Sequence, residues 1–156
     1  MNKPDLYLED LAVGQVYESG THTLDAAQIK AFAAQFDPQY FHLDEEAAKA
    51  SLFGGLAASG WNVAAVTMRL MVESNRIAGG LIGAGVEIAW PRPTRPGDTL
   101  RVVTEVVEVT PSRSRPERGM VLVRSNTLNQ LNEIVQTMAS RMVVPRRTVP
   151  ETETEK

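Results

Sequence analysis

An aspartate and one of only two histidines in the chain lie five residues apart in the stretch FDPQYFH, as Asp37 and His42. A histidine and a carboxylate that meet in a fold can hold one water molecule between them and move a proton to or from it. A plainer interpretation is that Asp37 caps a turn before Pro38 and that His42 is a structural histidine. The residues by themselves leave both interpretations open.

The segments around this pair must position it. Asp25 and Gln28 predict a capping box for a helix over residues 26–36. Pro38 ends that helix, because the residue before a proline avoids the helical conformation. A second short helix is predicted to open at Asp44, where acidic side chains favour the positive end of the helix dipole. We therefore expect the pair to lie between two helices.

A longer helix is predicted over the stretch SGWNVAAVTMRLMVESN, which is apolar on nearly every side from Trp61 to Met68. Such a helix must be wrapped by other structure, so we expect Trp61 in the core. Five segments rich in β-branched residues can supply the wrapping; they are residues 15–24, 81–90, 99–110, 119–130 and 133–144. Asn132, which tolerates a positive φ, predicts a tight hairpin between the last two. The pattern indicates an α+β domain in which an antiparallel sheet curls around one helix.

Composition bounds the class of protein. The 156 residues fit one domain, expected over residues 1–145, with residues 146–156 as a charged, disordered tail. There is no cysteine, which excludes disulfides, a thiolate nucleophile and cysteine-bound metals. A net charge of −3 argues against nucleic acid as the main partner. No apolar run is long enough to span a membrane and no signal peptide is visible, so we expect a cytoplasmic protein.

Several spaced motifs resemble the MaoC-type dehydratases, in the (R)-specific enoyl-CoA hydratase branch of the hotdog fold. The family signature is an acid, a five-residue step to histidine, Leu-Asp and an alanine-rich helix; here it reads Asp37, His42, Leu43-Asp44 and Ala47-Ala48. Ser59-Gly60 matches the pair that opens the family's central helix, and WPRPTRPGDTL resembles its proline-rich Gly-Asp turn. The likeness covers roughly residues 10–145.

The resemblance implies a hydro-lyase that reversibly adds water to a 2-enoyl thioester, without a metal or redox cofactor. Asp37 and His42 would share the task of activating the water and protonating the α-carbon; which of them is the base stays open, because the pair titrates together. Gly60 would offer a free backbone N–H to the enolate oxygen. These three residues are the predicted catalytic group.

Four further residues are predicted to bind substrate. Gln39 and Tyr40 stand where many hydratases have Asn-Pro, and Ser59 stands where many have histidine, so these positions bear on substrate choice. Ser59 is also a candidate helix cap, and Asn62 either lines the pocket or caps the same helix. His22, in a predicted strand without a partner motif, is interpreted as structural.

Two other functions stay as alternatives. A hotdog thioesterase commonly places a carboxylate on the central helix, and this helix has no acid before Glu73. A non-catalytic acyl-thioester binding subunit would tolerate loss of the acid–histidine pair, which this chain keeps. The partners implied are an acyl-CoA or acyl carrier protein substrate and a second copy of the chain, in a dimer or higher homo-oligomer. Loop arginines, Arg92 and Arg95 among them, could meet the phosphates of coenzyme A.

Overall fold

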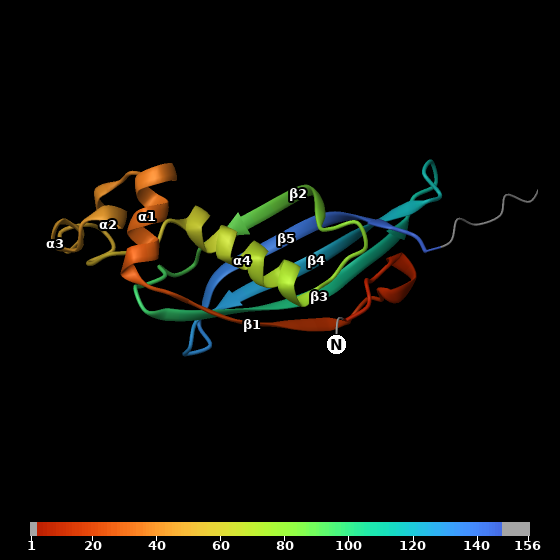
Figure 1. Ribbon diagram of the computed structural model, residues 1–156, viewed down its shortest axis with the longest axis horizontal. Helices are drawn as coiled ribbons and strands as arrows, with labels where there is room; N and C mark the ends of the chain where they lie inside the picture. The colour runs from red at the N-terminus through yellow and green to blue at the C-terminus, as the bar shows by residue number, and fades with distance from the viewer. Residues whose placement is uncertain (1–2, 148–156) are drawn as a thin grey trace, which may run out of the picture.

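A curved antiparallel sheet of five strands packs against one long helix in the computed structural model, which describes residues 3–147 (Figure 1). The elements in chain order are a 3-10 turn (Leu8–Asp10), β1 (Val16–Leu24), α1 (Ala26–Phe36), α2 (Tyr40–Leu43), α3 (Glu45–Ala48), α4 (Gly60–Ser74), β2 (Ile82–Ala89), β3 (Asp98–Pro111), β4 (Arg118–Leu128) and β5 (Ile134–Pro145). The strands lie side by side in the order β1-β3-β4-β5-β2. The predicted α+β arrangement is confirmed.

The core lies between α4 and the inner face of the sheet. Along β3, β4 and β5 buried residues alternate with partly exposed ones, so one face of each strand turns inward. From α4, the apolar side chains that face the sheet include Val63, Val66, Leu70 and Met71. This single interface positions the N-terminus of α4 relative to the rest of the chain.

The opposite side of α4 is not covered by the residues that the structure describes. Trp61 is 61% exposed and Met68 is 46% exposed, so the prediction that Trp61 belongs to the core is wrong. The physical reason is that the sheet curls around only one side of the helix, while α1, α2 and α3 gather at its N-terminal end (Figure 1). An apolar run all round a helix therefore indicated cover that residues 3–147 do not supply.

Local chemistry explains the ends of the elements. Asp25 caps α1, with its Oδ1 accepting from the N–H of Gln28 at 2.8 Å, but only half of the predicted capping box forms. The Gln28 side chain turns instead to His22, 2.7 Å away, which gives that histidine the structural role expected of it. Asn132 adopts a φ of 59° in the β4–β5 hairpin, as predicted.

Strand β2 is an open edge of the sheet. It pairs with β5 on one side and has no strand on the other side among the described residues. Ile82 and Val86 on this edge are 55% and 56% exposed. In the described part of the chain no helix has the length and hydropathy needed to cross a membrane. Of the predicted tail, residues 148–156 lie outside the described part, whereas the N–H of Arg146 donates to the carbonyl of Glu117 at 2.8 Å.

Candidate active site

The acid–histidine pair joins the end of α1 to the short helix α2. Asp37 is the C-cap of α1, where its N–H donates to the carbonyl of Ala33 at 2.9 Å, and Pro38 prevents the helix from continuing. Residues 40–43 then form one turn of helix, α2, which the sequence did not predict. That turn carries His42 back toward Asp37 and buries it to 4% exposure.

Both oxygens of the Asp37 carboxylate accept hydrogen bonds. The Ser59 hydroxyl donates to Oδ2 at 2.7 Å, and the Gln39 amide donates to Oδ1 at 2.6 Å. Partial burial by itself raises the pKa of Asp37, but the bonds from Ser59 and Gln39, together with His42, outweigh it and hold the pKa below its ordinary value. Asp37 is therefore a carboxylate at neutral pH.

The His42 ring is fixed in one tautomer. Its Nδ1 lies 2.6 Å from the carbonyl oxygen of Ala57, and because a carbonyl can only accept, Nδ1 carries a proton. In the neutral ring Nε2 is then an acceptor, and it lies 3.3 Å from Oδ2 of Asp37. With the ring neutral, no hydrogen lies between these two acceptors; with the ring protonated, Nε2 donates to Oδ2 as an ion pair. One water can satisfy both by donating a hydrogen to each, and a proton from that water can be taken up by the pair.

A backbone donor lies next to this pair. Ser59 is the N-cap of α4, its side chain accepting from the N–H of Trp61 at 3.3 Å, which confirms the capping prediction. Gly60 is the first residue of the helix, and its N–H donates to no other residue in the described part of the chain. Orphan N–H groups at a helix N-terminus attract negative charge. Gly60 can thus serve a developing oxyanion one residue from the serine that holds Asp37.

A cavity of about 370 Å³ opens over these groups. Its wall is mostly aromatic and aliphatic, from α2, the start of α4 and the segment after β2, and includes Gln39, His42, Gly60, Val63, Trp90 and Arg92. The structure thus brings Gln39, His42 and Gly60 to one cavity. Asp37 and Ser59 lie against them through the hydrogen bonds described above.

Of the four predicted substrate-binding residues, only Gln39 lies on this wall; Ser59 is fully buried and holds Asp37 instead. Tyr40 is 52% exposed and does not line the cavity, because α2 turns it outward. Asn62 is 5% exposed and also off the wall; its Nδ2 has no hydrogen-bond partner among the described residues, and it does not cap α4. The prediction that Tyr40 and Asn62 reach the site therefore finds no geometric basis.

Trp90 is a site residue that the sequence interpretation missed. A Cβ placed on Gly60 would come within 2.6 Å of its indole, so the glycine is required for the ring to lie against the helix start. The two residues are thirty positions apart, and only the packing of the β2 end against α4 brings them together. The sequence held one signal for this contact. It has a glycine at a helix start and, later, a tryptophan directly before a proline-rich turn.

The loop arginines separate into different roles. The Arg95 guanidinium donates to the carbonyls of Phe53, Gly55 and Leu56, and so ties the loop before α4 in place. Arg92 lines the cavity and pairs with Glu133 at 2.9 Å. Arg118 belongs to the start of β4 rather than to a loop. No group of three or more potential metal-binding His, Asp or Glu side chains occurs among residues 3–147.

Comparison with known proteins identifies the family. The family model described as MaoC like domain matches residues 10–127. The chain belongs to the MaoC-like family. A crystal structure of the MaoC-like dehydratase from Rhodospirillum rubrum is 60% identical, with a TM-score of 0.90, over 92% of this chain and 99% of that one.

Two other relatives extend this assignment. The uncharacterized protein YdeM of Bacillus subtilis is 34% identical over 126 residues, which cover 79% of this chain and 87% of YdeM. The R-hydratase PhaJ1 of Pseudomonas aeruginosa superposes with a TM-score of 0.74 at 24% identity, over 97% of this chain and 96% of that one, and so shares its fold. This MaoC-like protein therefore has the hotdog fold of a family of hydratases and dehydratases, as the motifs implied.

Proposed function

We propose that this MaoC-like protein is a hydro-lyase that adds water reversibly to a 2-enoyl thioester and yields the 3-hydroxyacyl thioester. The observation that carries the proposal is the tautomer of His42, which leaves Nε2 and the Asp37 carboxylate as adjacent acceptors. Such a pair binds one water through both hydrogens.

In the proposed reaction the water oxygen bonds to C3 of the enoyl group as one water proton passes to the pair. The electrons of the double bond move toward the thioester carbonyl. The resulting enolate oxygen accepts a hydrogen bond from the N–H of Gly60. Collapse of the enolate takes a proton at C2 from the pair, so one molecule of water has been added and the side chains return to their starting state. The reverse sequence dehydrates the hydroxyacyl thioester.

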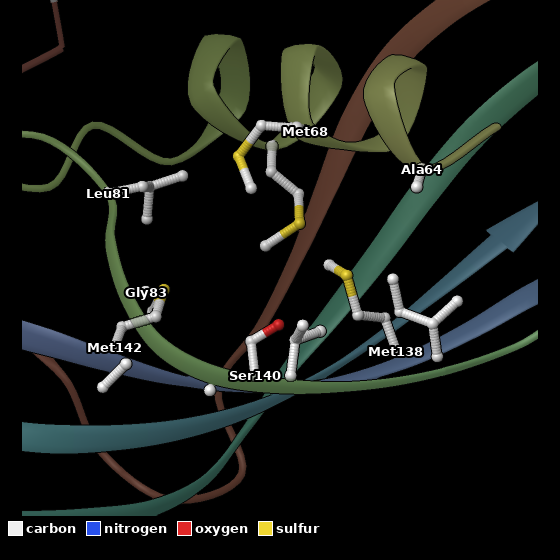
Figure 2. A pocket seen from close by; sticks show the side chains of 12 residues that line it. Ala64, Met68, Leu81, Gly83, Met138, Ser140 and Met142 are labelled. Carbon is white, nitrogen blue, oxygen red and sulfur yellow. The ribbon is translucent and has the colours of Figure 1, made fainter. Parts of the chain in front are cut away.

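The acyl group has a second cavity available. A groove of about 440 Å³ runs between α4 and β2, with Met68 above it and Met138, Ser140 and Met142 below it (Figure 2). Its lining is mostly apolar and includes Ala64 and Ile88, which are neighbours along the chain of Val63 and, two positions on, Trp90 of the catalytic cavity. We assign the groove to the acyl chain and the catalytic cavity to the thioester and the reacting carbons.

We further propose that the working form is at least a homodimer joined at β2. The edge of β2 is unpaired among the described residues and carries exposed Ile82 and Val86, and Val72 on the open side of α4 is 50% exposed. A bare apolar edge is a template for pairing with another strand. Sedimentation of Val86→Lys tests this point, since a charge at the centre of the edge should shift the protein toward monomer.

The function is tested with purified protein and 2-enoyl-CoA substrates of several chain lengths. Hydration removes the ultraviolet absorbance of the conjugated enoyl thioester without releasing thiol, and a free-thiol assay runs on the same samples. Absorbance loss without thiol supports the hydratase. Thiol release would instead establish a thioesterase, and binding without either change would establish a binding subunit.

A further inference from the structure

A chain of buried polar side chains holds the Trp90 indole. The indole N–H donates to Oε1 of Gln136 at 2.9 Å, and Nε2 of Gln136 donates to Oγ1 of Thr67 at 3.1 Å. That hydroxyl lies 2.6 Å from the hydroxyl of Thr127. Gln136, Thr67 and Thr127 are all 0% exposed. The four side chains come from four different elements, so the chain links the segment after β2 to the middle of the core.

Because Gln136, Thr67 and Thr127 are buried, their polar atoms need hydrogen-bond partners within the protein. An amide withdrawn from water costs free energy unless its donor and acceptor atoms are both satisfied, and a partly satisfied network is worse than an apolar core. The Gln136 amide has its oxygen on Trp90 and its nitrogen on Thr67, so rotation of the indole would strand a buried acceptor. The bond therefore selects one orientation of the tryptophan ring.

The held ring lines one cavity and is 41% exposed, and its neighbours along the strands line the other cavity. Trp90 lines the catalytic cavity and covers Gly60, while Ile88, two residues earlier on the same strand end, lines the methionine groove. The same two-residue spacing occurs on β5, where Gln136 holds the indole and Met138 lines the groove. Trp90 and its amide anchor are therefore each two positions from a residue that lines the groove.

We propose that Trp90 is the residue that determines acyl specificity, acting as a fixed wall between the catalytic cavity and the groove, with Gln136 as its positioning residue. The inference rests on the proposed function for the identity of the ligand as an acyl thioester. In this proposal an acyl group that reaches from the Gly60 N–H into the groove passes the edge of the indole. The ring therefore limits the length and bulk of acyl groups that react.

The test compares acyl-length preference in Trp90→Ala, Gln136→Leu and Trp61→Phe. Trp61 is the matched control, because it contacts Trp90 edge-on at 5.4 Å between ring centroids, has no hydrogen bond to Gln136 and lies outside both cavities. Two quantities are measured. One is kcat/KM for four-carbon and eight-carbon 2-enoyl-CoA, and the other is the calorimetric Kd for saturated butanoyl-CoA and octanoyl-CoA, which cannot be hydrated.

The eight-carbon to four-carbon ratio should rise about tenfold or more in Trp90→Ala, by several-fold in Gln136→Leu, and not at all in Trp61→Phe. An unchanged ratio in Trp90→Ala with hydration intact overturns this inference and leaves the proposed function standing. If there is no hydration but the ratio of the two Kd values depends on Trp90, the proposed function is overturned and the role of Trp90 as a wall stands. If the wild type neither hydrates the enoyl-CoAs nor binds the saturated acyl-CoAs, both fail.

Fluorescence separates a fixed wall from a merely packed ring. In Trp61→Phe, Trp90 is the only tryptophan, because the chain has two. Adding Gln136→Leu should then increase acrylamide quenching of its emission, since the ring is released from the buried amide. Equal quenching with and without Gln136, in protein whose circular dichroism is unchanged, would show that the amide does not position the indole.

Discussion

The catalytic cavity and the methionine groove lie along the same helix, yet different interactions shape them. In the cavity, directional hydrogen bonds from Ser59 and Gln39 and to the Ala57 carbonyl fix the atoms of Asp37 and His42. The groove is lined by four methionines, with small residues of β2 between them. Methionine is flexible and fills irregular space. The difference indicates that proton transfer requires fixed atoms, while acyl binding requires a surface that can adjust to its ligand.

Asp37→Asn should be the most damaging change in the cavity. It removes the charge that binds the water and takes part in proton transfer, and we expect kcat to fall by about 10²–10⁴. Asp44→Asn is the matched control, because Asp44 accepts from the N–H groups of Glu46 and Ala47 as the cap of α3. Stopped-flow absorbance should show almost wild-type turnover for the control. Equal losses in the two variants would mean that Asp37 is only a cap.

Gly60→Ala should be next in size. The new Cβ would meet the Trp90 ring, so the ring or the helix start must move away from the position that presents the N–H to substrate. A shift near 1 Å at the reacting centre costs roughly 10²-fold in rate. The double variant Gly60→Ala with Trp90→Leu should recover part of that loss. Full activity of Gly60→Ala would contradict the close approach.

Substitutions in the groove should change the free energy of unfolding more than the rate of hydration. Met71 is 2% exposed, so Met71→Ala should lower the free energy of unfolding by about 2–5 kcal/mol, whereas Met71→Leu should cost under about 1.5 kcal/mol. Urea unfolding measures both. Turnover of a four-carbon substrate should change only a few-fold in folded protein. A loss as large as that of Asp37→Asn would remove the distinction between the two regions.

Gln39→Ala should give the smallest effect, and the size of that effect depends on pH. The pKa of Asp37 is lowered in the folded protein, so the carboxylate stabilises the fold above the ordinary carboxyl pKa of about 3.9, and that stabilisation is lost as the pH falls through the lower folded value. Removing the Gln39 donor should cost about 1 kcal/mol near pH 7 and much less in acid. Unfolding free energies that differ equally at both pH values would contradict this linkage.

The sequence predicts most of the fold because its signals are local. Helix α1 was expected over residues 26–36 and is found there, since Asp25 caps it and Pro38 ends it. The strands follow from alternation that buries one face. Trp61 was wrongly predicted to be buried, because the prediction used only the apolar character of the helix. It did not consider how far five strands can curl around that helix.

The site was predicted only in part for a similar reason. The motif supplied Asp37, His42 and Gly60, which lie close along the chain or at a recognisable helix start. Trp90 and Gln136 reach the site through strand packing over long sequence separation, and no spacing rule connects them to α4. The hydrogen bond from His42 to Ala57, which decides the tautomer, involves a backbone carbonyl and leaves no trace in residue types.

The central claim is that Asp37 and His42 act as one unit on one water. A double-mutant cycle of kcat with Asp37→Asn, His42→Ala and the combined variant tests it directly, using one 2-enoyl-CoA substrate and circular dichroism to confirm folding. Groups that act together give non-additive losses, so the double variant should be about as slow as the slower single variant. Losses that multiply would show that the two residues work independently, and near wild-type rates in either single variant would contradict the shared water.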